Sequence, residues 1–130
     1  MTLNNLLTAI MTKTVDSTLS SDVAGRIFLD EAPQEAEKPY VVFFIVSDVP
    51  EKTFTEDFEN IIIQFSLFSD SEGAAEITTM YNDMKTLFDE CTFSITASTL
   101  IWMNRVNLTT MFEDGVRHWA VDYEIKTSLD

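Results

Sequence analysis

Strict alternation of apolar and polar residues near the C-terminus limits the possible folds more than any other feature. In the segment that begins at Val116, every second residue from Trp119 to Ile125 is large and apolar. A period of two places alternate side chains on opposite faces of a β-strand. The strand therefore needs a sheet with one covered face and one face in water. Trp119, Val121, Tyr123 and Ile125 share the first face, and His118, Ala120, Asp122, Glu124 and Lys126 share the second.

Two further segments predict an antiparallel hairpin. Tyr40–Val46 is rich in β-branched and aromatic residues, which favours a strand. Phe58–Phe68 alternates with a period of two. Pro50 is expected to end the first strand, and Glu51–Asp57 to form a charged connection to the second.

Shorter patterns complete the expected sheet. A short strand is expected near Arg26–Leu29, followed by a polar, proline-containing loop at Asp30–Lys38. Residues 100–108 alternate again. Glu113-Asp114-Gly115 then predicts a turn, because an Asp-Gly pair accepts positive φ at low cost.

Apolar residues at spacings of three and four predict two amphipathic helices. The first covers about Leu3–Val15, and the Ser/Thr-rich stretch Asp16–Asp22 is expected to fray from its end. The second covers about Glu72–Glu90, with a capping-box pattern formed by Ser69 and Glu72 at its start. The apolar stripe of the second helix is Ile77, Met80, Tyr81, Met84, Leu87, Phe88 and Cys91.

The expected order is helix, three strands, helix, two strands. The chain has 130 residues, the usual size of one domain. No linker or repeat divides it. We expect a single α+β domain over residues 1–130, with a mostly antiparallel sheet of four to five strands and both helices packed on one face.

The charge of the chain excludes several kinds of partner. There are 22 Asp and Glu against 8 Lys and Arg, a net charge of −14. The basic residues are scattered, so no cluster can neutralise nucleic-acid phosphates, and an acidic surface repels anionic membranes. The charge keeps the protein soluble, or suits a basic partner, or prevents adhesion to DNA that passes close by. One cysteine and an N-terminus without signal-peptide features fit a reducing cytosol.

No arrangement of residues points to catalysis. His118 is the one histidine, and one histidine without a cysteine pair does not make a familiar metal site, so we expect a structural or surface role. Cys91 follows Asp89 and Glu90, which disfavour a thiolate, so a packing role is expected. Three glycines in the whole chain exclude a glycine-rich phosphate loop. We expect no enzyme activity, no cofactor and no metal.

Apolar residues within polar segments are candidates for protein contacts. One group lies in the connection between two strands, and the other lies at the Asp-Gly turn. Neither group has a local reason to be buried, whereas the methionines of the second helix fit core packing. The candidate interface residues are Phe54, Thr55, Glu56, Met111, Phe112, Glu113 and Asp114.

Several strings, taken in order, resemble the tail completion or tail terminator proteins of long-tailed bacteriophages. After the first helix and an acidic loop comes Pro39–Val42. Ile61–Ser69 then runs directly into a helix that starts within Ser71–Ala75. Near the end, Phe112–Trp119 leads into the aromatic strand Val121–Ile125. The resemblance covers most of the chain as a pattern and contains no invariant motif.

The resemblance implies a structural role in a phage tail. The chain would form a ring at the head-proximal end of the tail tube, stop tube polymerisation and offer a surface to the head connector. Its implied partners are copies of itself, the tail-tube protein and the head-connector protein. DNA would pass through an acidic lumen without specific binding. The implied location is the virion tail, and the bacterial cytoplasm during assembly.

Other hypotheses stay open at this point. A different neck component, such as a head–tail connector subunit, would share the small α+β design. An acidic inhibitor of the immunity or antitoxin kind would also be small, cytosolic and strongly negative, and would bind a basic partner protein. The hypothesis of an enzyme rests on His118 alone.

Overall fold

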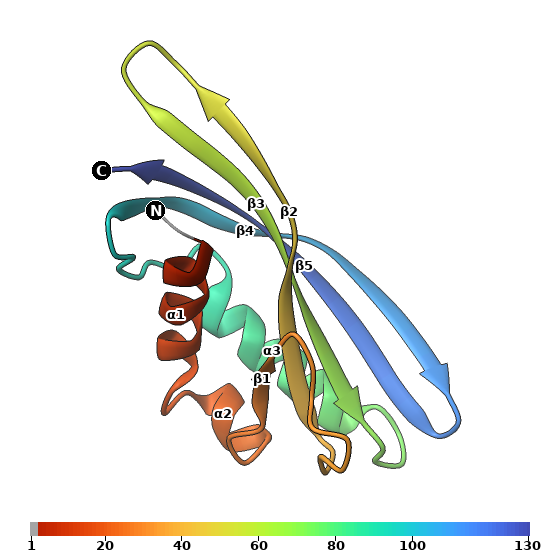
Figure 1. The fold of residues 1–130 in the computed structure, drawn as a ribbon. Helices are drawn as coiled ribbons and strands as arrows, with labels where there is room; N and C mark the ends of the chain where they lie inside the picture. The colour runs from red at the N-terminus through yellow and green to blue at the C-terminus, as the bar shows by residue number, and fades with distance from the viewer. Residues whose placement is uncertain (1–2) are drawn as a thin grey trace.

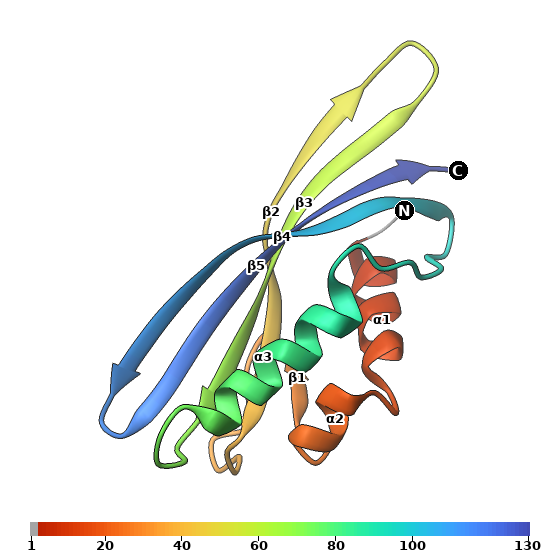
Figure 2. The ribbon, with the colours of Figure 1, turned by 180° about the vertical axis from the view of Figure 1, so that it is seen from behind.

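The computed structural model describes residues 3–130, and across them one five-stranded sheet carries three helices on a single face. Figure 1 shows the helices on one side of the sheet, and Figure 2 shows the same layers from behind. The expected α+β class is confirmed. The elements are α1 (Leu3–Thr14), α2 (Thr18–Asp22), β1 (Ile27–Leu29), β2 (Tyr40–Lys52), β3 (Asp57–Ser69), α3 (Ala75–Phe88), β4 (Ser98–Glu113) and β5 (Val116–Leu129).

The strand order in the sheet is β1-β2-β3-β5-β4. Two long hairpins, β2–β3 and β4–β5, lie side by side because β3 pairs with β5. These pairings are antiparallel, and only the short β1 runs parallel to its neighbour β2. The sheet is therefore mixed but mostly antiparallel, as expected.

The first hairpin is longer than the sequence pattern predicts. β2 continues through Pro50, which pairs with Glu59, so the expected end at Pro50 is wrong. Proline is tolerated in an edge strand, where its missing N–H leaves no ladder bond unmade. This part of β2 is an edge because β1 pairs only with Val41–Phe43. The connection shrinks from the expected Glu51–Asp57 to the four residues 53–56.

The core lies between the helices and the inner face of the sheet, meaning the face that the helices cover. Phe65 stands at its centre, with ring centroids 4.7 Å from Phe88 and 5.7 Å from both Phe43 and Tyr123. The alternation in β3 and β5 is confirmed because its apolar positions point into this core. Fully buried side chains include Leu6, Ile10, Ile61, Ile63, Phe65, Leu67, Ile77, Met80, Met84, Phe88, Met103, Val121, Tyr123 and Ile125.

Two expectations about the helices are wrong. The expected fraying stretch contains α2, which begins after Ser17, whose side chain accepts a hydrogen bond from the Ser20 N–H. The capping box is absent because β3 runs to Ser69, and the chain needs a loop before it can turn back into a helix. Ser69 instead donates a hydrogen bond to Glu76 at 2.6 Å, and α3 begins at Ala75 without a side-chain cap.

The alternation expected in β4 is interrupted. Register shifts occur between Leu100 and Trp102 and between Arg105 and Asn107. Each shift is an irregularity of the kind that a β-bulge produces, and a bulge moves the following residues to the other face. Arg105 and Leu108 are three apart in sequence, yet they pair with Tyr123 and Val121, which both face the core.

Candidate protein-interaction surfaces

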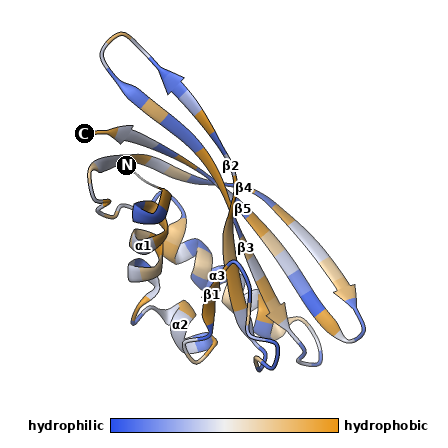
Figure 3. Cartoon of the chain, viewed as in Figure 1, coloured by the Kyte–Doolittle hydropathy of each residue, from blue (hydrophilic) through white to orange (hydrophobic). Residues whose placement is uncertain are grey.

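The structure separates the two groups of candidate interface residues. The end of the β2–β3 hairpin projects from one end of the sheet, and the β4–β5 turn projects from the other (Figure 1). β3 has 13 residues, so at about 3.3 Å per residue the two ends lie roughly 40 Å apart. Polar and apolar residues alternate along both projecting hairpins in Figure 3. The two groups therefore form two separate surfaces.

Phe54 stands at the end of the first hairpin. The tight end is held by Thr53, whose N–H donates to the Glu56 carbonyl at 2.9 Å and whose hydroxyl accepts from the Glu56 N–H at 3.1 Å. Phe54, Thr55 and Glu56 are all exposed, and Phe54 has a relative exposure of 110%. A fully exposed phenylalanine on an ordered turn is a strong candidate for an anchor in a protein partner.

The second hairpin end differs from the expected loop. Met111, Phe112 and Glu113 belong to β4, and only Asp114 and Gly115 form the turn, with φ of 54° and 78°. Met111 is 44% exposed and Phe112 is 61% exposed. Because the two are neighbours in a strand, they point to opposite faces of the sheet.

Each of these two residues has a partner on β5. Phe112 packs under the Arg117 guanidinium, 4.5 Å from the ring centroid, on the inner side. Met111 pairs with His118 on the outer face, the face without helices. The second end therefore offers apolar surface on both faces of the sheet.

A row of aromatic side chains crosses the outer face. His118 on β5 stacks on Phe68 of β3 with centroids 4.3 Å apart, and Phe68 lies 4.9 Å from Tyr40 of β2. Phe28 of β1 meets Tyr40 edge-on at 6.0 Å. The alternation in the sequence predicts His118 on the face opposite Trp119, Val121 and Tyr123, but it does not predict the contact with Phe68. Their cross-strand register is set by the β3–β5 pairing.

The loop after β1 turns this row into one side of a groove. Asp30–Gln34 and the outer-face residues Tyr40, Val42, Phe44, Phe68 and His118 line an open groove of about 450 Å³. Burial lowers the pKa of His118. Its buried Nε2 atom has no hydrogen-bond partner in the described part of the chain. The His118 ring therefore has a structural contact with Phe68, while its Nε2 atom is left without a hydrogen bond.

A polar network joins the end of α3 to the sheet. Asp89 pairs with Arg105 at 3.1 Å and accepts a hydrogen bond from the Tyr123 hydroxyl at 2.5 Å. Arg105 also donates to the Tyr81 hydroxyl at 2.5 Å. Burial, then the hydrogen bond to Asp89, raises the pKa of Tyr123, so its hydroxyl remains a donor. The network is structural, since each group has its partner within the fold.

Cys91 has a packing role, as expected. It is half-buried, and its Sγ lies 3.7 Å from the Met103 sulfur. Burial is the main cause that raises the pKa of Cys91, with Asp89 a smaller one. A thiol with a raised pKa is a poor nucleophile.

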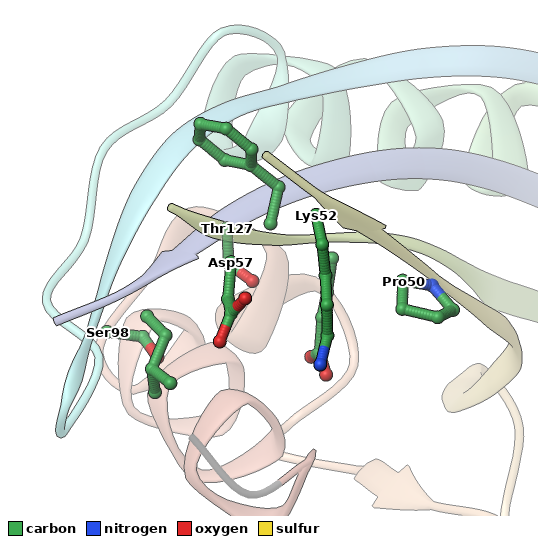
Figure 4. Close-up of a pocket in the computed structure, with 8 residues that line it drawn as sticks. Pro50, Lys52, Asp57, Ser98 and Thr127 are labelled. Atoms are coloured by element: carbon green, nitrogen blue, oxygen red, sulfur yellow. The ribbon is translucent and has the colours of Figure 1, made fainter. Parts of the chain in front are cut away.

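A small hollow of about 190 Å³ lies where the first hairpin leaves the helices (Figure 4). Pro50, Lys52 and Asp57 line it from the hairpin, and Ser98 and Thr127 from β4 and β5. Ser98 is not hydrogen-bonded to a base in this hollow, because among residues 3–130 its buried Oγ atom has no hydrogen-bond partner. Within residues 3–130, no group of three or more His, Cys, Asp or Glu side chains is placed to hold a metal ion. No helix in the described part of the chain has the length and apolar character needed to cross a membrane.

The comparisons with known proteins agree with the fold. A chain from a structure described as the virion of a native gene transfer agent particle matches with a TM-score of 0.79 at 12% identity, over 93% of this chain and 92% of that one. A second solved structure, whose description names no function, matches with a TM-score of 0.69 at 10% identity, over 100% and 96%. Identities this low establish a shared fold. No curated protein sequence matches this chain significantly.

The family comparison goes further. Residues 8–128 match the model of the family described as tail completion protein gp17. The match includes both hairpins, α2, α3 and most of α1. A match over nearly the whole chain, together with the fold, identifies it as a structural component of a phage tail. The chain belongs to the tail completion protein gp17 family.

Proposed function

We propose that this protein forms a ring at the head-proximal end of the tail tube, stops tube growth there and joins the tail to the head connector. One observation carries the proposal: two hairpin ends, each with an exposed phenylalanine, project from opposite ends of one sheet. A ring uses heterologous contacts, in which one surface of each copy meets a different surface of the next. Two distinct ends on a single subunit are suited to such contacts.

The edges of the sheet support the same proposal. Among the described residues, no strand pairs with the outer edge of the 16-residue β4, and none pairs with the edge of β2 opposite β3 beyond Phe43. Unpaired edges are templates for strand pairing with another chain. The irregularities in β4 and Pro50 in β2 limit uncontrolled pairing, which restricts association to a defined geometry.

The charge fits a passage for DNA. At a net charge of −14, copies arranged around a lumen present carboxylates to the phosphate backbone and repel it. DNA then slides through without specific binding. We propose no enzymatic activity and no cofactor, which agrees with a role that depends on contacts alone. The gene transfer agent chain of the same fold was observed in a virion, which supports a place in the assembled particle. Assembly in the bacterial cytoplasm is part of the proposal.

The direct test is electron microscopy of the purified protein mixed with self-polymerising tail-tube protein from the same source. We expect the protein at one end of each tube, with growth halted at that end and ring-shaped density in end views. A stable monomer that never associates with tubes would contradict the proposal. That result would favour the acidic inhibitor of a basic partner.

Phe54→Asp tests the first hairpin end. Since Phe54 makes no buried contact, the variant should keep its thermal midpoint while ring or tube-end assembly is lost. Val15→Asp is the matched control, because Val15 is also exposed, at 63%, but lies after α1 in the helical layer. Assembly by Phe54→Asp at the level of the control would exclude the hairpin end from the interface.

A further inference from the structure

The groove on the outer face of the sheet has the features of a peptide-binding site. Its floor is mostly apolar and aromatic, formed by Tyr40, Val42, Phe44 and Phe68, with the polar Gln64 and Ser66 among them. No helix within residues 3–130 covers this face (Figures 1 and 2). An uncovered aromatic floor beside a loop is a typical place for a partner side chain to insert.

The rim of the groove is negative. Asp30 and Glu31 line it directly, and Glu35 and Glu37 lie in the same loop, against one basic residue, Lys38. Lys38 is directed to the Tyr40 ring, with its Nζ atom 5.9 Å from the ring centroid. An apolar floor inside an acidic rim complements a large apolar side chain flanked by basic residues.

His118 supplies the polar contact at the end of the floor. Its Nε2 atom is buried and has no hydrogen-bond partner among residues 3–130. A buried polar atom without a partner is costly, and it gains a hydrogen bond when a donor enters the groove. The ring stack on Phe68 at 4.3 Å keeps the imidazole in place for that contact.

We propose that this groove binds a basic segment of a different protein, through an apolar side chain on the aromatic floor, basic side chains at the Asp30–Glu31 rim and a hydrogen bond to His118. A second copy of this chain is a poor occupant, because its exposed hairpin ends carry Glu56, Asp57, Glu113 and Asp114 and would meet like charges. Peptide binding at this groove is a function separate from ring formation. Its test uses the isolated protein, so its outcome does not depend on whether the protein assembles at the tube end.

His118 is also the reporter for the test, since a chain with one histidine gives one imidazole Hε1 signal in NMR. The probe is the capped peptide Gly-Arg-Arg-Phe-Arg-Arg-Gly. We expect it to shift the His118 signal in a saturable manner at low salt. The peptide with Glu in place of each Arg, and the peptide with Ala in place of Phe, should produce at most weak shifts.

Matched charge variants locate the site. Asp30→Asn with Glu31→Gln should weaken peptide binding by about three- to tenfold, the effect expected for two exposed ionic contacts. Asp16→Asn with Glu72→Gln removes the same amount of charge from residues that do not line the groove. Asp16 has a positive φ, as Asp30 does, so the two Asp→Asn changes are made in the same backbone conformation. This control should bind like the wild type.

Three results would overturn the proposal. The first is an equal shift of the His118 signal by the Glu or Ala peptide, which would remove the specificity for basic and aromatic groups. The second is equal weakening by the rim and control variants. The third is a shift that follows the concentration of the protein without any peptide, which would make a second copy the occupant.

Discussion

Asp22→Asn is expected to stabilise this protein at neutral pH. Asp22 ends α2, which packs on α3 where Asp83 lies. Burial, followed by a hydrogen bond and the charge of Asp83, raises the pKa of Asp22 from 3.8 to about 6. When both carboxyls are ionised neither can donate a hydrogen bond, and the buried Oδ2 of Asp22 has no hydrogen-bond partner within the described residues. An asparagine removes one charge and supplies a donor.

The magnitude follows from the pKa. A rise from 3.8 to about 6, at about 1.4 kcal/mol per pKa unit, gives an upper bound of about 3 kcal/mol. The site is partly exposed and screened by water, so we expect Asp22→Asn to gain about 1 kcal/mol. The sign is fixed by linkage. The folded pKa lies above the unfolded one, so stability is lost as pH rises from about 4 through about 6, and the gain from Asp22→Asn appears over that window.

Urea denaturation followed by tryptophan fluorescence measures the effect between pH 5 and pH 8. This range stays above the pI of about 4.1, near which the solubility of the protein is lowest. The difference in unfolding free energy should be largest at pH 7 and above, and roughly half as large at pH 5. Asp70→Asn, at an exposed loop position, controls for the general loss of negative charge. A variant no more stable than this control, or a difference constant with pH, would refute the coupling between Asp22 and Asp83.

Two further substitutions test the network and the core by urea denaturation. Tyr123→Phe removes the hydroxyl that donates to Asp89 and should cost about 1 kcal/mol, while Tyr40→Phe on the outer face should cost little; equal losses would argue against the network. Met84→Ala should cost about 2–5 kcal/mol, because Met84 is fully buried. Met111→Ala, at a 44% exposed site, should change stability by less than about 0.5 kcal/mol, and a larger loss would show that Met111 packs in the core.

In the proposed ring, the two hairpin ends would let one small subunit present different surfaces to different neighbours. Phe54 and Phe112 lie at opposite ends of the sheet, and the β3–β5 pairing holds the two hairpins in one register. The Asp89–Arg105 pair adds a link between the sheet and α3. A rigid subunit of this form keeps its two ends at a fixed separation, which a closed ring requires.

Local patterns in the sequence were sufficient for most of the fold. The alternation in 116–126 and the stripe from Ile77 to Phe88 identified which side chains are buried, because a side chain is buried or exposed according to the period of its own element. The Asp114-Gly115 turn was also evident, since positive φ is a property of those two residues. These features depend on neighbours only a few positions away.

The remaining features depend on residues far apart in the chain. β2 continues through Pro50 because β1 is too short to cover that part of its edge, and α3 starts at Ala75 because β3 extends to Ser69. Asp22 meets Asp83, and His118 stacks on Phe68, only after the sheet and helices pack. The local periods of β3, β5 and α3 are therefore enough to identify their buried faces. Where those faces end, and which residues meet across them, depends on strand register and helix docking, which are set by contacts that no local period encodes.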